Sequence, residues 1–249
     1  MKKLAFILLP LLTVLFACQS SQTPPKTTQP PVEKKPAGTT EVQPEKSEPK
    51  NIIRDVNPPS KETKESATLF HRGLELVQAQ KYEEGIDYLN RALKEDPKNA
   101  RIYFNRGYAY YSTRDYDKAQ ADFNSSLQIN PADTMAILYS GLTKYYKKDF
   151  SGAYKDFTDA ITKSKRFSKA YYNRGLVRGQ LKDYKGAVDD FTQSIIIEPT
   201  YGQAYYNRGL ANFYKKDTMN ACFDWIQANR MGVTEAQKAV DLYCEKWKR

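Results

Sequence analysis

The sequence has little of what most catalytic and metal sites are built from. Its 249 residues include one histidine, His71, and three cysteines. A single histidine cannot supply a multi-histidine metal site, and no HExxH, CxxC, GxSxG, GxGxxG or GxxxxGK(S/T) string occurs. These absences argue against metal hydrolases and nucleotide-binding enzymes. We therefore expect no catalytic residue, no metal and no cofactor, and we assign His71 to packing or to the surface.

Aromatic residues are missing from a long stretch near the start. No Phe, Tyr or Trp lies between Phe16 and Phe70, and nine of the thirteen prolines fall within this stretch. Without large apolar side chains such a segment cannot bury enough surface to fold. Residues 18–65 are therefore predicted to be a disordered, proline-rich linker. All nineteen tyrosines lie from Tyr82 onward, so the globular part follows the linker.

Long hydrophobic runs are also absent, except at the very start. Leu4–Phe16 is an apolar run of thirteen residues behind Lys2 and Lys3. A helix that spans a bilayer needs about 17 to 25 residues. The run is too short for that and predicts a signal peptide over residues 1–17.

The end of this run, Leu15-Phe16-Ala17-Cys18, resembles the bacterial lipobox. The resemblance implies that Cys18 is acylated and becomes the mature N-terminus, which makes the lipid bilayer a partner, since more than one acyl chain anchors durably. The alternative is an ordinary secretory signal with an incidental cysteine. Gln19 follows, rather than the aspartate that favours inner-membrane retention in enteric bacteria. We therefore expect a bacterial cell-envelope protein, lipid-anchored in the outer membrane and facing the periplasm.

A period of thirty-four residues runs through the rest of the chain. Glycine recurs at this spacing, a small residue follows twelve positions later, and a large residue follows four positions after that. The three columns are Gly73, Gly107, Gly141, Gly175 and Gly209; Gly85, Ala119, Ala153, Ala187 and Ala221; and Leu89, Phe123, Phe157, Phe191 and Trp225. Each period holds two amphipathic helices separated by a break. The small residues allow the two helices to approach closely.

The period and the order of these residues resemble the tetratricopeptide repeat (TPR). The resemblance implies an all-α fold, an α-solenoid of five tandem TPR helix hairpins. The predicted repeats are residues 66–99, 100–133, 134–167, 168–201 and 202–234, followed by a capping helix within 235–249. An aspartate precedes the second helix in four repeats, where its side chain can cap free backbone N–H groups. These aspartates are Asp115, Asp149, Asp183 and Asp217, and the first repeat has Lys81 instead.

In this family the first helix of each repeat lines the concave side of the stack. By that resemblance the groove would hold Phe70, Arg101, Phe104, Tyr108, Tyr111, Tyr145, Tyr146, Lys169, Tyr172, Tyr206, Phe213 and Tyr214. Rigid aromatic side chains suit the recognition of a peptide or a partner helix. We therefore expect a non-catalytic interaction scaffold or assembly factor with a protein or peptide partner. Two alternatives stay open: the aromatics pack between repeats, or the protein is a structural envelope lipoprotein that binds peptidoglycan or other glycans.

Polar residues stand at several positions where the family has apolar ones. Arg106, Arg174 and Arg208 replace the usual leucine, and we predict packed aliphatic stems with solvated guanidinium heads. Lys144, Arg178 and Asn212 occupy expected core positions, which makes the packing there uncertain.

Charge and cysteine content complete the sequence-based expectations. From Ala67 onward there are 29 basic and 22 acidic residues. This excess favours acidic partners, but an exported protein seldom meets nucleic acid, so we expect none; the oligomeric state stays open. Cys222 and Cys244 lie on consecutive predicted helices that an antiparallel hairpin would bring together. They form either a disulfide or two buried thiols.

Overall fold

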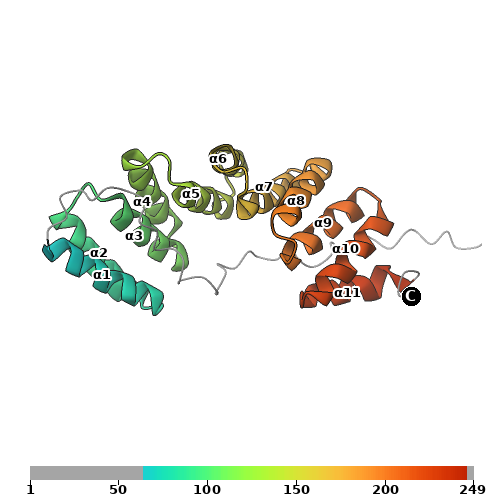
Figure 1. Cartoon of the computed structure of the whole chain (residues 1–249), viewed down its shortest axis with the longest axis horizontal. Helices are drawn as coiled ribbons and strands as arrows, with labels where there is room; N and C mark the ends of the chain where they lie inside the picture. The colour runs from blue at the N-terminus through green and yellow to red at the C-terminus, as the bar shows by residue number, and fades with distance from the viewer. Residues whose placement is uncertain (1–63, 246–249) are drawn as a thin grey trace, which may run out of the picture. The chain divides into compact units, whose positions relative to one another are not determined.

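A computed structural model describes residues 64–245 of the chain, and this part contains eleven α-helices and no strand. The helices follow one another along a curved row of hairpins (Figure 1). Their bounds are α1 Lys64–Gln78, α2 Tyr82–Glu95, α3 Ala100–Ser112, α4 Tyr116–Ile129, α5 Thr134–Tyr146, α6 Phe150–Lys163, α7 Ser168–Gln180, α8 Tyr184–Ile197, α9 Gly202–Tyr214, α10 Thr218–Arg230 and α11 Thr234–Tyr243. The predicted all-α solenoid is confirmed.

Close packing within each hairpin comes from the glycine of the first helix. A Cβ atom added at Gly141 would lie 2.7 Å from Cε1 of Phe157 on the partner helix, and one added at Gly107 would lie 3.0 Å from Cε1 of Phe123. Such distances are too short for non-bonded carbon atoms. Only glycine lets these two buried rings lie directly against the backbone of the first helix, as the spacing of the repeat predicts.

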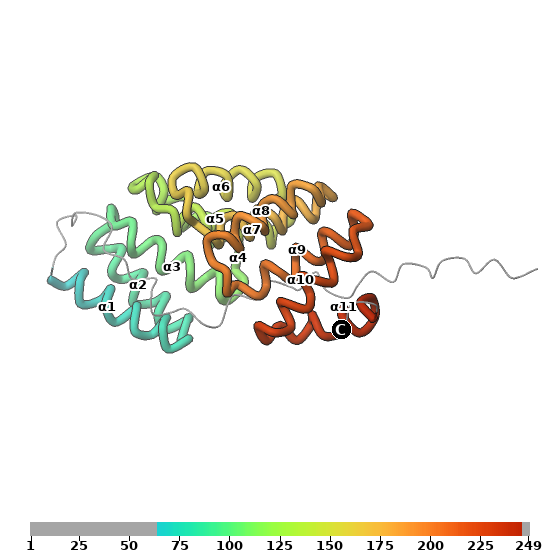
Figure 2. Tube along the Cα trace, turned by 45° about the vertical axis from the view of Figure 1, so that its right-hand side comes forward, coloured from blue at the N-terminus to red at the C-terminus, as the bar shows by residue number. Residues whose placement is uncertain are grey.

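Consecutive hairpins stack through two kinds of contact. Each second helix packs against the first helix of the following hairpin, as α4 does against α5. Each first helix also contacts the first helix of the next hairpin, from α1 with α3 through to α7 with α9. The first helices therefore form one continuous inner layer. The tube in Figure 2 shows this order from α1 to α11.

The turn inside each hairpin has the same construction in all five repeats. Two positions before each second helix stands a residue in the left-handed backbone region, with φ between 61° and 65°. These residues are Gln80, Arg114, Lys148, Lys182 and Lys216. In repeats two to five the next residue is the predicted aspartate, and its carboxylate accepts a hydrogen bond from the backbone N–H three residues later. Lys81 makes no such bond, so α2 begins without a side-chain cap.

The last helix covers the end of the stack, as the sequence predicts. α11 buries Ala236, Ala239 and Val240 in a cluster with Trp225 of α10. The indole N–H of Trp225 donates a hydrogen bond to the carbonyl oxygen of Tyr206, 3.2 Å away. α11 and the hairpin of α9 and α10 thus share one apolar core.

The predicted signal peptide, the predicted lipidation site Cys18 and nearly all of the predicted linker lie outside the described residues. Within residues 64–245, no helix has the length and apolar character needed to cross a membrane. The lipid anchor stays a prediction from the sequence.

Candidate functional site

The structure divides the twelve predicted groove residues into two groups. Five are buried, with exposed fractions between 1% and 6%: Phe70, Phe104, Tyr111, Tyr172 and Tyr206. Their rings lie between helices. The ring of Phe104, for example, lies 5.8 Å from those of both Phe123 and Tyr139, and the ring of Tyr172 lies 4.8 Å from that of Tyr201. The prediction that these five residues line a groove is wrong, because neighbouring helices cover them.

The other seven residues are accessible and lie on the first helices α3, α5, α7 and α9. We call them the aromatic face: Arg101, Tyr108, Tyr145, Tyr146, Lys169, Phe213 and Tyr214. Six are half-buried, and Tyr214 is 38% exposed. The ring of Tyr108 is held edge-on by Tyr139 at 5.3 Å, and the guanidinium of Arg101 lies 5.1 Å above the ring of Phe70. Packing against neighbouring side chains such as Tyr139 and Phe70 therefore restricts the movement of these residues while leaving part of each one accessible.

The electrostatics of the aromatic face combine neutral phenols with basic groups. Burial raises the pKa of the hydroxyls of Tyr108 and Tyr145. Both phenols are therefore neutral at physiological pH and available for hydrogen bonds, and Gln180 already donates one to the Tyr145 hydroxyl at 3.4 Å. The positive charge of Lys169 partly offsets the rise in the pKa of Tyr108. The charge of Lys169 on α7 thus interacts electrostatically with the hydroxyl of Tyr108 on α3.

The guanidinium groups of the repeated arginines are paired, contrary to the prediction that they are solvated. Arg106 binds Asp122 with two hydrogen bonds of 2.8 and 2.7 Å, and Nη1 of the same arginine reaches Asn90 of the preceding hairpin at 2.7 Å. Arg174 and Arg208 bind Asp190 and Asp224 in the same way. A planar guanidinium matches a carboxylate in this two-point geometry. Each arginine therefore connects three helices, which a leucine could not do by hydrogen bonding.

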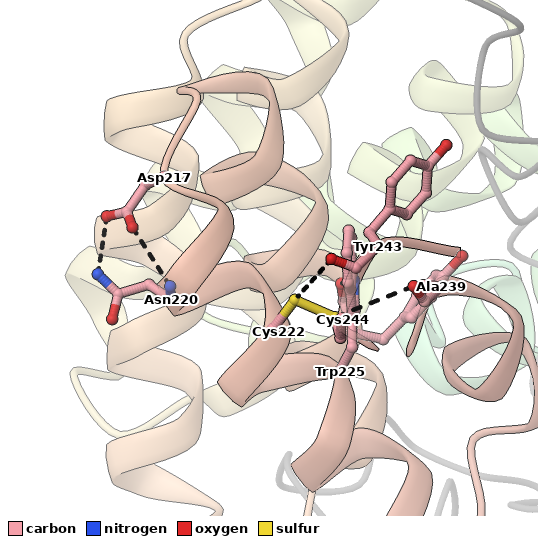
Figure 3. Close-up of a disulfide and its surroundings, with 8 residues drawn as sticks. Asp217, Asn220, Cys222, Trp225, Ala239, Tyr243 and Cys244 are labelled. Carbon is pink, nitrogen blue, oxygen red and sulfur yellow. Dashed lines mark hydrogen bonds between the residues drawn. A yellow bond between two sulfur atoms is a disulfide. The ribbon is translucent and has the colours of Figure 1, made fainter. Parts of the chain in front are cut away.

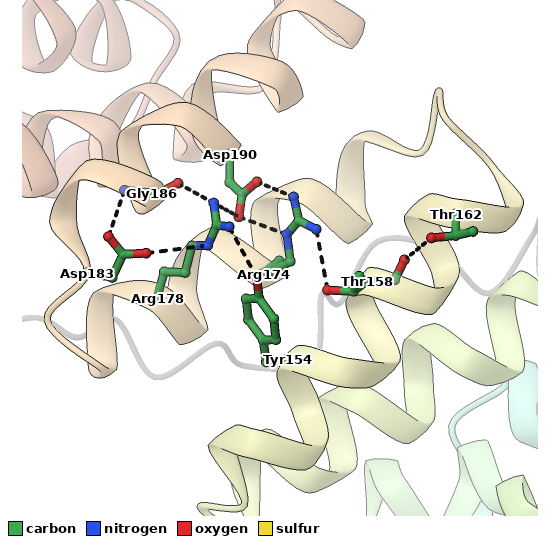
Figure 4. Close-up of polar contacts among 8 residues, drawn as sticks. All are labelled: Tyr154, Thr158, Thr162, Arg174, Arg178, Asp183, Gly186 and Asp190. Carbon is green, nitrogen blue, oxygen red and sulfur yellow. Dashed lines mark hydrogen bonds and ion pairs between the residues drawn. The ribbon is translucent and has the colours of Figure 1, made fainter.

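The polar residues at expected core positions belong to the same network, so packing there is maintained by hydrogen bonds. In the fourth repeat Arg178 approaches Asp190 at 3.1 Å and donates to the Tyr154 hydroxyl at 3.2 Å (Figure 4). In the third repeat Lys144 and Ser140 both bind Asp156 at 2.7 Å. In the fifth, Asn212 donates to Asp224 at 3.2 Å.

Sequence reasoning missed the aspartates that these residues bind. Asp122, Asp156, Asp190 and Asp224 recur every thirty-four residues, so the column was visible as a sequence pattern. A charged column in a helix is easily assigned to solvent, and only the pairing shows that these carboxylates are enclosed. Burial raises the pKa of Asp122 and Asp224, and the adjacent arginines offset this only in part. These aspartates hold the hairpins together.

The remaining candidates are the cysteines and the histidine. Cys222 of α10 and Cys244, just after α11, are joined by a disulfide, with their Cα atoms 5.5 Å apart (Figure 3). Both residues are fully buried in the terminal cluster. His71 is exposed on α1, with its ring 6.0 Å from that of Phe70. Residues 64–245 contain no group of three or more His, Cys, Asp and Glu side chains placed to hold a metal ion.

Comparisons with known proteins agree with the repeat pattern. Residues 70–134 and 168–201 match models of the tetratricopeptide repeat. No curated protein sequence matches the chain significantly.

Solved structures give the same fold. A crystal structure of MamA is 21% identical with a TM-score of 0.61, over 66% of this chain and 96% of that one. MamA from Desulfovibrio magneticus RS-1 (residues 41 to the end) is 16% identical with a TM-score of 0.65, over 69% and 97%. YrrB, described as a TPR protein with an unusual peptide-binding site, is 18% identical with a TM-score of 0.60, over 71% and 92%. At these identities the likeness shows the fold alone.

Proposed function

We propose that this array of tetratricopeptide repeats is a non-catalytic scaffold that binds a protein partner on its aromatic face. The observation that carries the proposal is the half-buried row of Tyr108, Tyr145 and Phe213, which stands on the inner layer of first helices. The description of YrrB as a peptide-binding TPR protein supports a peptide or helix as the bound element.

The chemistry of this face suits such a partner. Tyr and Phe present a large contact area and lose little conformational entropy on binding, because they have only two rotatable side-chain bonds. Rings that are already held from below, as Tyr108 is by Tyr139, lose even less. The neutral hydroxyls add directional hydrogen bonds, and Arg101 and Lys169 add positive charge for acidic partner residues.

The test is a double substitution, Tyr108→Ala with Tyr145→Ala, in the full-length protein. Both side chains are half-buried, so the fold should survive, whereas truncation of the buried Tyr111 would report on packing. A matched control is Phe223→Ala, which removes an aromatic side chain that is 56% exposed on the second helix α10. Partners are captured by crosslinking in intact cells and identified by mass spectrometry. We expect the double variant, but not the control, to lose its main partner. Equal capture by both variants would contradict the proposal.

A sedimentation assay with the same variants distinguishes a protein ligand from a glycan ligand. If the aromatic face binds peptidoglycan instead, purified cell wall should sediment the wild-type protein, and the double variant should stay in solution. That result, without loss of a protein partner, would replace the scaffold by a structural wall-binding protein.

We also propose that Cys18 anchors the scaffold to a membrane of the bacterial envelope, with residues 18–65 as a spacer. The support is the apolar run followed by Ala17-Cys18. Cys18→Ala should abolish labelling with a radioactive fatty acid and move the protein from the membrane fraction to the soluble fraction. A variant that stays fully membrane-bound would contradict the anchor.

An oxidising compartment is part of this proposal, and the disulfide supports it. Protein purified from its native location and alkylated under denaturing conditions without reductant should show no mass increase from Cys222 and Cys244. Two alkyl adducts would show that the thiols are reduced there and would argue against export.

A further inference from the structure

One position of the inner layer carries a tyrosine in the second hairpin and a glycine in the fourth. In the second, Tyr111 near the end of α3 is 2% exposed, and its ring lies 6.0 Å from that of Tyr116 and 5.8 Å from that of Tyr146. The residue 68 positions later, two repeats along, is Gly179 near the end of α7. One hairpin thus has a buried ring where the other has only a hydrogen atom.

Two of the three rings around Tyr111 have equivalents in the fourth hairpin, whereas the third, Tyr139 at 5.5 Å, is replaced by Asn207. Tyr116 and Tyr146 stack with centroids 5.3 Å apart and an angle of 4° between their planes. Their equivalents, Tyr184 and Tyr214, stack in the same way at 5.0 Å and 14°. A Cβ atom added at Gly179 would have no heavy atom within 4 Å. The fourth hairpin therefore keeps the stacked pair and has open space next to Gly179, where the side chain of Tyr111 begins in the second hairpin.

Gly179 has no structural reason to be glycine. At the neighbouring Gly175, a Cβ atom would lie 2.8 Å from Cε1 of Phe191, so packing explains that glycine. Among the described glycines, a Cβ atom meets open space only at Gly179 and Gly232, and Gly232 adopts a φ of 85°, which explains it. Gly179 has an ordinary helical backbone, where alanine would be more stable. Its role is the space that it leaves.

The surface around this space is positively charged. Near the end of α7, Arg174 and Arg178 are both paired with Asp190. The turns that follow α7 and α9 hold three exposed lysines, Lys182, Lys215 and Lys216.

The two aspartates of these turns are already engaged. Asp183 accepts a hydrogen bond from the backbone N–H of Gly186, and Asp217 accepts one from that of Asn220. Both carboxylates stay charged, and the three lysines outnumber them, so the two turns together carry a net positive charge.

We propose that the space at Gly179 receives an aromatic side chain from an acidic peptide segment of a partner protein. The ring lies beside the stacked Tyr184 and Tyr214, where the ring of Tyr111 lies in the second hairpin, and the flanking carboxylates face the lysines of the two turns. This assignment rests on the proposed scaffold function and names the side chain that the scaffold selects. The linker of this chain cannot supply the ring, because no aromatic residue lies between Phe16 and Phe70.

The probe is a fluorescein-labelled peptide with one phenylalanine between three glutamates on each side. Two matched peptides carry alanine in place of the phenylalanine, or glutamines in place of the glutamates. Fluorescence anisotropy measures their dissociation constants with the full-length protein. We expect the wild type to bind the first peptide about tenfold more tightly than either matched peptide.

Four proteins make the test specific. Gly179→Leu fills the space and should remove the preference for phenylalanine, whereas the control Ala121→Leu, which adds the same side chain on the exposed face of α4, should keep it. Lys215→Glu with Lys216→Glu should remove the preference for glutamate. Circular dichroism should show that no variant is less stable than the wild type, and Gly179→Leu should have an equal or higher thermal midpoint, because leucine favours a helix more than glycine does.

Several outcomes would overturn the inference. One is a Gly179→Leu variant that keeps the preference for phenylalanine, and another is a wild type that binds all three peptides alike. If Gly179→Leu instead abolishes self-association in analytical ultracentrifugation, the occupant is a second copy. The scaffold function is judged separately, by whether Tyr108→Ala with Tyr145→Ala loses its crosslinked partner.

Discussion

The first and fourth hairpins carry the same arginine in very different surroundings. Arg174 of α7 has 15% of its side chain exposed and binds Asp190, of which 3% is exposed. Arg72 stands at the equivalent position of α1, but Tyr88 replaces the aspartate. Arg72 turns outward and pairs with Glu75, and 55% and 64% of these two side chains are exposed.

The comparison indicates that the residue sixteen positions after the arginine decides whether its guanidinium group is buried or exposed to solvent. A guanidinium is buried only where a carboxylate can compensate for the loss of water. In the first hairpin no such carboxylate exists, so the arginine stays in solvent and its ion pair contributes little to stability. In repeats two, four and five the buried aspartate makes the polar network part of the core.

The largest effect should follow from removing the aspartate of the fourth hairpin. Asp190→Ala leaves Arg174 and Arg178 enclosed without their carboxylate, and breaking such a pair costs about 3–5 kcal/mol of unfolding free energy. Urea denaturation followed by circular dichroism measures the change. The neighbouring Asp189 is exposed, and Asp189→Ala should stay within about 0.5 kcal/mol of the wild type. Equal losses for the two variants would show that the network does not stabilise the fold.

A smaller difference should separate the second hairpin from the fourth. Arg106→Met leaves Asp122 without its cation, whereas Arg174→Met leaves Asp190 with Arg178, 3.1 Å away. We expect Arg106→Met to cost about 1–2 kcal/mol more than Arg174→Met, because a buried charge without a partner retains its desolvation penalty. The same urea titrations measure both. If Arg174→Met costs as much, Arg178 does not compensate.

The first hairpin can be improved by giving it a feature of the fourth. Lys81 has nearly the same backbone conformation as Asp183, with φ and ψ of −89° and 67° against −79° and 70°. Lys81→Asp should therefore cap α2 and raise the free energy of unfolding by about 0.5–1 kcal/mol. Lys81→Ala removes the same positive charge without adding a cap and should give no such gain. If both variants raise the free energy of unfolding equally, the gain comes from removal of the positive charge of Lys81 and not from the cap.

The weakest effect on stability concerns the protonation of buried and capping aspartates. Burial raises the pKa of Asp122 and Asp224, so protonation of these two carboxyl groups favours the folded state. This stabilisation by protonation is complete below the ordinary pKa of aspartate and declines as the pH rises through the pKa of the folded state. For Asp115 the hydrogen bond from Lys118 lowers the pKa, and for Asp217 the hydrogen bond from Asn220 does so. The contribution of these two caps is present above the ordinary pKa and is lost as the pH falls.

Carbon-13 NMR of the carboxyl groups would test this ordering. Asp122 and Asp224 should titrate at higher pH than Asp115 and Asp217. A common midpoint for all four aspartates would mean that burial does not separate them.

Much of the architecture could be predicted from the residues alone. The glycine, small-residue and large-residue columns predicted five hairpins, because each column reports a contact between helices that lie close together in sequence. The aspartate caps could also be predicted, since a cap bonds a backbone group only three residues away.

The candidate site could be predicted only in part. Tyr108 and Tyr111 stand three residues apart on the same helix, yet one is accessible and the other is buried against Tyr139 and Tyr146 of the next hairpin. Helical spacing places both on one side of α3 and does not state how far the next hairpin reaches. The arginine–aspartate pairs lie within single hairpins and were missed because a charged column in a helix is easily assigned to solvent.

What the sequence determined by itself is everything that repeats locally: the hairpins, their order and the aspartates that begin the second helices, because these depend on backbone groups and neighbours a few residues apart. What only the tertiary structure decided is which side chains are covered. The packing of helices within and between hairpins buries Tyr111, encloses Asp190 with two arginines and leaves the space at Gly179, since burial depends on the atoms that other helices bring to the same place.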